Sequence, residues 1–329
     1  MKRRHFLSTG LGVVAAPALI GVRPALAQAK YPDRPIRLVI PFAPAGPTDI
    51  IGRKVGEKMT GLMGQTWVID NKAGAAGSIG SVEVKNAKPD GYTLLFATSS
   101  THAINPTAYV KPLYDAVKDF TPISSICVNP AVLAARVDMP DTVMGLVDVM
   151  KKNPGKHSYG SSGTGSIFHL SGEYLKREVG GMDVEHIPYK GSAPALNDMM
   201  SGQIAWMFDT FATMLPLHRA GKIRILGVAY SARSPIAPDV PSMIEAGVKG
   251  YEAYTFNLIL GPANMPKNAV EALDQASRKM LADPDMVKFL NDVGAPPTPD
   301  TTPEKTAKFI TDEIAKWAPV IKAAGVKVE

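Results

Sequence analysis

The run IRLVIPFAPAGPTDI, residues 36–50, decides the fold class that the sequence predicts. Apart from Arg37, it opens with apolar and β-branched residues up to Phe42, a pattern typical of a buried strand. Turn-forming residues follow at 43–47, and Thr48 and Asp49 are residues that commonly cap the N-terminus of a helix. Apolar residues then recur at helical spacing, at Ile51, Val55, Met59 and Leu62. Strand, turn and helix in this order predict one unit of a parallel sheet covered by helices.

The same alternation of strands and helices continues along the rest of the chain. Further strands are predicted at 67–70, 92–98, 131–135, 157–160, 184–187, 205–208, 224–229 and 254–262. Helices are predicted after the glycines of 74–80 and at 142–152, 166–179, 194–201, 213–220, 267–281 and 303–324.

This order predicts an α/β protein of two lobes, each a mostly parallel sheet flanked by helices. Lobe 1 is expected to hold residues 28–127 and 255–329, and lobe 2 residues 128–254. The chain would then cross between the lobes twice. Two crossing segments make a hinge about which the lobes can close on a ligand.

Residues 1–27 have the layout of a cleavable signal peptide. A basic head at 2–4 precedes an apolar run at 10–22, and small residues at 25–27 mark the cleavage site. The run is too short to cross a bilayer as a stable helix. The head, RRHFL at 3–7, resembles a twin-arginine export signal, and an ordinary Sec signal is the alternative. The mature protein is therefore expected in the periplasm.

Removal of this segment changes the charge of the chain. The full sequence has 36 basic and 30 acidic residues, a net charge of +6. Four of the basic residues lie in the signal peptide, which leaves 32 against 30, a net charge of +2. Nucleic-acid binding needs a clustered basic surface, so this balance argues against a nucleic-acid partner. The single cysteine, Cys127, excludes an internal disulfide and a cysteine-clustered metal site.

The residues that could carry catalysis follow no known catalytic pattern. The sequence has no G-x-S-x-G, G-x-G-x-x-G, P-loop or H-E-x-x-H motif. The histidines lack metal-ligand spacing, and a hydrogen-bonded structural role is the favoured interpretation for His102 and His169. Asp209 ends a predicted strand, where α/β sheets place ligands, but capping of the next helix is an equal alternative. We therefore expect no enzyme activity, no metal and no cofactor.

Two turn-rich loops are the strongest candidates for a ligand site. Residues 42–49 and 159–166 each end a predicted strand and open a helix. Their small residues let backbone N–H groups face outward, and the helix that follows adds unpaired N–H groups and the positive end of its dipole. One such loop in each lobe would hold an anionic ligand at both ends of a cleft. Loops that only turn the chain are the alternative that this spacing leaves open.

Several short motifs occur in a fixed order along the whole mature chain. They are YPDRPI at 31–36, PFAPAGPTDI at 41–50, PDGYTLL at 89–95, HAINP at 102–106, DFTP at 119–122, YGSSG at 159–163, HLSGE at 169–173, VEHIPYKGSAPAL at 184–196, MFD at 207–209 and PDVP at 238–241. Together they resemble the Bug family, the periplasmic substrate-binding receptors of tripartite tricarboxylate transporters.

The resemblance implies a two-lobed periplasmic-binding-protein fold that closes on a small organic acid. In this family the acid is mostly a dicarboxylate, aliphatic or aromatic, and integral-membrane transporter subunits receive it. We expect the receptor to be a monomer. A receptor that engages a membrane sensor in place of a transporter shares the fold and the ligand, so the sequence leaves that alternative open. A periplasmic hydrolase is disfavoured because no nucleophile–base pair is recognisable.

The resemblance also implies which residues contact the ligand. The predicted contacts are Phe42, Ala43, Ala45, Gly46, Thr48, Asp49, Thr98, Ser99, His102, Ser161, Ser162, Gly163, Thr164, Gly165, Ser166, Tyr189 and Asp209. The first loop departs from the family pattern A-P-G-G at Ala45, and Pro47 follows. Ala45 restricts the backbone more than glycine would, and Pro47 removes an N–H donor. Fewer amides are therefore expected to face the ligand from this loop.

Overall fold

The computed structural model describes residues 31–323 and 325–329, so the predicted signal peptide and its cleavage site lie outside the described residues. Strand β1 (Ile36–Ile40) and helix α1 (Pro47–Met63) are the first elements. Helix α1 begins before the predicted caps, since Gly46 is its N-cap and Pro47 its first residue. Proline already has the backbone angle of a first helical turn and needs no N–H there, which explains the earlier start.

The first sheet runs in the order β2-β1-β3-β9-β4. Strands β2 (Trp67–Asn71) and β3 (Thr93–Thr98) flank β1, and all three are parallel. Strand β9 (Tyr254–Pro262) pairs antiparallel with β3, and β4 (Phe120–Ala135) pairs antiparallel with β9. A strand from late in the sequence therefore lies in the middle of a sheet that begins at residue 36.

The second sheet is built on the last five residues of β4. These residues, 131–135, pair antiparallel with β7 (Trp206–Thr210) on one side and β8 (Arg224–Val228) on the other. Strand β5 (Ser158–Ser161) is parallel to both β7 and β6 (Glu185–Pro188). The predicted α/β class with flanking helices is confirmed. Both sheets are mixed, because every pairing that involves β4 or β9 is antiparallel, whereas the other four pairings are parallel.

Strand β4 is much longer than the predicted strand at 131–135. Its first part carries Pro122 and Pro130, residues that usually interrupt a strand and that hid it from sequence analysis. The pairing with β9 shifts register between Pro122 and Ser124 and again between Ser125 and Cys127. These irregularities let a strand with two prolines stay in the sheet.

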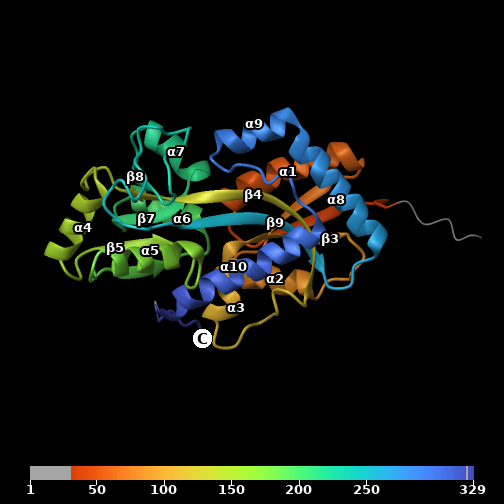
Figure 1. Ribbon diagram of the computed structural model, residues 1–329, viewed down its shortest axis with the longest axis horizontal. Coiled ribbons are helices and arrows are strands. Elements are labelled where there is room, and N and C mark those ends of the chain that lie inside the picture. Colours follow the sequence, from red (N-terminus) through yellow and green to blue (C-terminus); the bar gives the residue numbers. More distant parts are fainter. Residues whose placement is uncertain (1–30, 324) are drawn as a thin grey trace, which may run out of the picture. The chain divides into compact units, whose positions relative to one another are not determined.

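Helices flank both sheets (Figure 1). The helices beside the first sheet are α1, α2 (Ser78–Lys85), α3 (Asn105–Ala108), α8 (Lys267–Ala282), α9 (Pro284–Asp292) and α10 (Pro303–Ala323), with the short helical turns η1 (Ala75–Gly77) and η2 (Ser100–Ile104). The helices beside the second sheet are α4 (Val143–Lys152), α5 (Ile167–Glu178), α6 (Ser192–Met200) and α7 (Phe211–Arg219). Helix α9 was not predicted; Asp283 caps it by accepting from the N–H groups of Asp285 and Met286.

The two strands β4 and β9 run together between the two groups of helices (Figure 1). They are the segments by which the chain passes from one sheet to the other and back. The predicted lobe boundaries fall inside β4 and at the start of β9, and they stay predictions. Within the described residues, none of the helices combines the length and the apolar character that a bilayer crossing requires.

Candidate ligand-binding site

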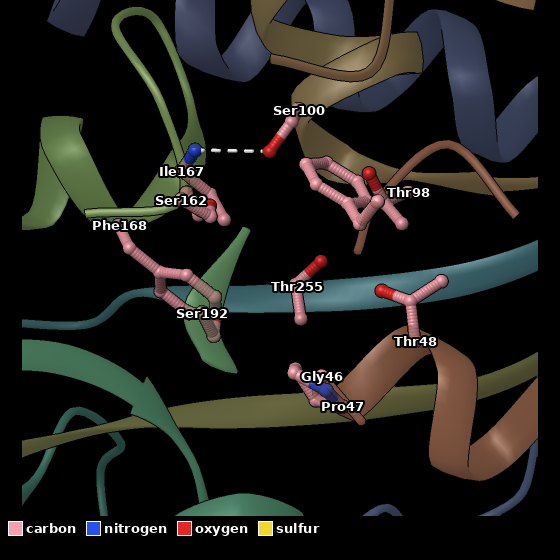
Figure 2. Close-up of a pocket in the computed structure, with 11 residues that line it drawn as sticks. Gly46, Pro47, Thr48, Thr98, Ser100, Ser162, Ile167, Phe168, Ser192 and Thr255 are labelled. Carbon is pink, nitrogen blue, oxygen red and sulfur yellow. Dashed lines mark hydrogen bonds between the residues drawn. The ribbon is translucent and has the colours of Figure 1, made fainter. Parts of the chain in front are cut away.

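A pocket lies where the two sheets meet, and hydroxyl groups and aromatic rings line it (Figure 2). Its cavity volume is about 20 Å³, which is room for about one water molecule. Its lining residues are Phe42, Gly46, Pro47, Thr48, Thr98, Ser100, Ser162, Ile167, Phe168, Ser192 and Thr255. None of these described lining residues is charged. A charged ligand would therefore meet neutral donors and partial charges.

Three helices begin at this pocket. Pro47 and Thr48 are the first residues of α1, Ile167 and Phe168 of α5, and Ser192 of α6. The first turn of a helix carries N–H groups without partners in the helix and the positive end of the helix dipole. The convergence of three such ends favours an anionic ligand.

The first loop is held in shape by Asp49, which does not line the pocket. One carboxylate oxygen accepts from Ala45 N (2.9 Å) and from Arg53 Nε (2.8 Å), and the other accepts from Asn71 Nδ2 (3.0 Å). Burial alone would raise the pKa of Asp49, but the hydrogen bonds from Arg53, the Ala45 amide and Asn71 outweigh it and lower the pKa. The ionised Asp49 carboxylate thus stabilises the first loop from beneath through these hydrogen bonds.

The second loop follows β5 and contributes Ser162 to the pocket. Ser161 lies beneath the loop, where its Oγ is 2.7 Å from His186 Nε2. Ser166 caps α5 by accepting from His169 N (3.3 Å). Gly163 and Thr164 line a neighbouring outer cavity together with Tyr189, whose hydroxyl donates to Asp198 Oδ2 (2.7 Å).

The residues at the end of β3 and directly after it lie partly in the pocket lining and partly in the core. Thr98 and Ser100 line the pocket, whereas Ser99 donates to Thr255 Oγ1 (2.8 Å) beneath it. His102 is fully buried against the rings of Tyr114 and Phe120, and burial lowers its pKa to about 3. His102 is predicted to contact the ligand, but in the structure its side chain lies in the core and not in the pocket lining.

Ser100 and His102 lie on opposite sides of one helical turn. Residues 100–104 form η2, and side chains two residues apart on such a turn point to nearly opposite sides. Ser100 Oγ accepts a hydrogen bond from Ile167 N (3.1 Å), another residue of the pocket lining (Figure 2). This bond joins η2, which follows β3 of the first sheet, to the N-terminus of α5, which lies beside the second sheet.

Asp209, at the end of β7, is buried and outside the pocket lining. Its Oδ2 accepts from Thr213 Oγ1 (2.8 Å) one turn into α7. Burial raises the pKa of this carboxyl to about 7. Its observed contact is with the following helix, which is the alternative to ligand contact that the sequence left open.

Comparison with known proteins assigns the chain to a family. Residues 51–326 match the model described as the tripartite tricarboxylate transporter family receptor. The chain belongs to this receptor family. The predicted Bug-family resemblance is confirmed.

Solved structures similar to the receptor share its fold. The periplasmic binding protein BugD is 34% identical, with a TM-score of 0.87 over 91% of this chain and 100% of that chain. Rpa4515 of R. palustris, solved with adipate, is 33% identical with a TM-score of 0.87, over 91% and 99%. MatC from Rhodopseudomonas palustris, solved with bound malate, is 30% identical with a TM-score of 0.85, over 88% and 100%. The receptor therefore has the predicted two-lobed fold of periplasmic binding proteins.

The pocket of the receptor contains some of the residues proposed as contacts and omits others. Phe42, Gly46, Thr48, Thr98 and Ser162 line it. The lining residues that sequence reasoning did not propose are Pro47, Ser100, Ile167, Phe168, Ser192 and Thr255. The one signal in the sequence for Ser192 was Gly191 before it, because glycine is among the residues that occur at the N-cap of a helix. Among the described residues, no three His, Cys, Asp or Glu side chains are grouped as a metal site requires.

Proposed function

We propose that this receptor binds a small organic dicarboxylate between its lobes in the periplasm and delivers it to integral-membrane transporter subunits. The observation that carries the proposal is the convergence of three helix N-termini on a pocket whose described lining is uncharged. The adipate of Rpa4515 and the malate of MatC support the choice of a dicarboxylate.

The pocket offers two kinds of stabilisation to a carboxylate. Each helix N-terminus contributes roughly 0.3–1 kcal/mol, and up to ~2 kcal/mol where the group is partly buried. Hydrogen bonds from amides and from the hydroxyls of Thr48, Ser162 and Ser192 to an ionised oxygen are stronger than those between neutral groups. Micromolar affinity needs only about −8 kcal/mol, which two bound carboxylates and a buried carbon skeleton can supply.

Closure of the lobes is the step that traps the acid. Strands β4 and β9 carry the chain between the sheets, and we propose that they form the hinge, with lobe 1 at 28–127 and 255–329 and lobe 2 at 128–254. The hydrogen bond from Ile167 N to Ser100 Oγ spans the pocket and belongs to the closed arrangement. The ligand stabilises this arrangement by its higher affinity for the closed form.

Thermal melting and calorimetry with a panel of acids test the proposal. Malate, succinate, adipate and terephthalate are compared with the matching uncharged diamides. At a hundred times its dissociation constant, a bound acid should stabilise the receptor by about 2.7 kcal/mol, while the diamides should leave the melting temperature unchanged. A panel in which no acid raises the melting temperature, or in which the diamides act equally, would contradict the proposal. Capture of transporter subunits from membranes with and without the acid tests the delivery step.

A further inference from the structure

Two stacked imidazole rings lie beneath the second loop of the pocket, which follows β5. His169 comes from α5 and His186 from β6, and their ring centroids are 3.9 Å apart with the planes inclined by 14°. His169 is almost completely buried and His186 partly. Neither residue lines the pocket, so the proposed ligand contacts do not account for them.

Each ring makes a hydrogen bond to one side of the loop. The amide of Gly165 donates to His169 Nδ1 (3.0 Å), and His186 Nε2 is paired with Ser161 Oγ (2.7 Å). Ser161 Oγ also accepts from Gly163 N (3.1 Å), so the effect of His186 extends to the middle of the loop. The two rings thus hold the segment on either side of Ser162.

The loop needs such support because its backbone is intrinsically free. Gly163 and Gly165 have φ values of 133° and 79°, conformations that glycine adopts as one choice among many. The loop also lies between the end of β5 at Ser161 and the start of α5 at Ile167, so neither a strand nor a helix fixes its shape.

We propose that His169 and His186, both neutral, are positioning residues that fix the Ser161–Gly165 loop in the shape in which Ser162 and the N-terminus of α5 face the ligand. The inference rests on the proposed function, because it presumes that this pocket holds the acid. The residues act through the loop and touch no ligand themselves.

The surroundings keep both rings neutral. Burial and the positive charge of Lys176 lower the pKa of His169 to about 4. Burial, the neighbouring His169 and Lys176 lower the pKa of His186 to about 3. Glu173 opposes this at His169, but its carboxylate is already engaged by the Tyr159 hydroxyl (2.6 Å) and by Lys176 Nζ (2.9 Å). Since His169 Nδ1 accepts a hydrogen bond, the proton of the neutral ring is on Nε2.

Amide replacements distinguish this role from simple packing. The oxygen of asparagine can take the place of histidine Nδ1, and the oxygen of glutamine the place of Nε2. His169→Asn should therefore keep the acceptor for Gly165, whereas His169→Gln should not. The pattern reverses at the other ring: His186→Gln should keep the partner of Ser161, and His186→Asn should lose it.

The experiment measures adipate and malate affinity by calorimetry for the wild type and these four variants, together with melting temperatures without ligand. We expect His169→Asn and His186→Gln to bind within about twofold of the wild type, and His169→Gln and His186→Asn to bind roughly threefold to tenfold more weakly. Hydrogen exchange of the peptide that contains Gly163 and Gly165 should be faster in the two weak variants only.

Two results would overturn the inference. If affinity follows melting temperature across all four variants without regard to the amide chosen, the rings serve only as packing. If all four variants bind as the wild type does, the loop needs no support from them. A wild type that binds no acid of the panel would instead overturn the proposed function, and the inference with it.

Discussion

Ala45 adopts a left-handed backbone conformation, with a φ of 62°, in which a side chain is strained. Its amide donates to Asp49 Oδ2 (2.9 Å), and the same carboxylate is held by Arg53 and Asn71. These hydrogen bonds offset the strain, so the turn forms without a glycine at this position. The departure from the family pattern at Ala45 therefore leaves the turn intact and costs stability.

Ala45→Gly should accordingly raise the free energy of unfolding, by up to about 1 kcal/mol, because removal of the side chain relieves the left-handed strain. Ala43→Gly is the matched control in the same loop. Ala43 has no positive φ, so its replacement should lower stability by roughly 0.5–1 kcal/mol through the added freedom of the unfolded chain. Urea unfolding of both variants checks the opposite signs, and a loss of stability in both would contradict the strain at Ala45.

At the scale of single residues, the sequence predicts the pocket-lining residues that directly follow a strand. It does not predict those whose place in the lining depends on tertiary packing. Gly46 and Ser162 follow from the order of strand, loop and helix. Ser100 lines the pocket and His102 lies in the core, because side chains two residues apart on the η2 turn point to nearly opposite sides, and the sequence does not show which side faces the pocket. Thr255 lines the pocket because β9 lies between β3 and β4, a long-range pairing that composition and periodicity do not encode.

Among the elements, helix α6 adds the third N-terminus to the pocket because it begins at Ser192, two residues before its predicted start. Gly191 precedes it with a φ of 147°. A side chain built there would lie 3.0 Å from both the amide nitrogen and Cβ of Ala43, so the α6 N-terminus and the first loop are already in close contact. Only glycine allows this approach.

Gly191→Ala should therefore weaken adipate binding by roughly tenfold, because the new methyl group separates α6 from the first loop and hinders closure. Gly181→Ala is the control, since Gly181 also has a positive φ (94°) but no atom within 4 Å of the added carbon. Both variants should lose roughly 1–2 kcal/mol of stability from strain, but Gly181→Ala should keep its affinity. Calorimetry that shows equal affinities for the two variants would contradict the close contact as the cause.

Across the whole molecule, buried histidines should make stability depend on pH. Burial lowers the pKa of His102, His169 and His186 to about 3, 4 and 3, whereas a histidine of the unfolded chain takes up a proton near pH 6.5. As the pH falls from about 6.5 to about 4, the unfolded state binds protons that the folded state does not, so stability falls. Asp209 opposes this, because burial raises its pKa to about 7 and the folded protein keeps its proton.

The three histidines outnumber Asp209, so the melting temperature should fall by roughly 3–6 °C between pH 6.5 and pH 5. Asp209→Asn removes the opposing group and should make the fall steeper. Calorimetric melting of the wild type and this variant in buffers of equal ionic strength checks both slopes. A melting temperature that is constant or rises toward pH 5 would show that the buried histidines are protonated in the folded protein.

The central place of β9 also constrains how the chain folds during synthesis. Strands β1, β2 and β3 are complete once Thr98 is available, but the edge of β3 that faces β9 has no partner until Tyr254–Pro262 has been made. All of the second sheet precedes that point in the chain. The first sheet therefore closes only after the second half has been synthesised, and until then an unpaired, apolar strand edge is open to aggregation. Folding of this receptor thus depends on contacts that are distant in sequence, which predicts slow folding relative to a chain with its lobes in series.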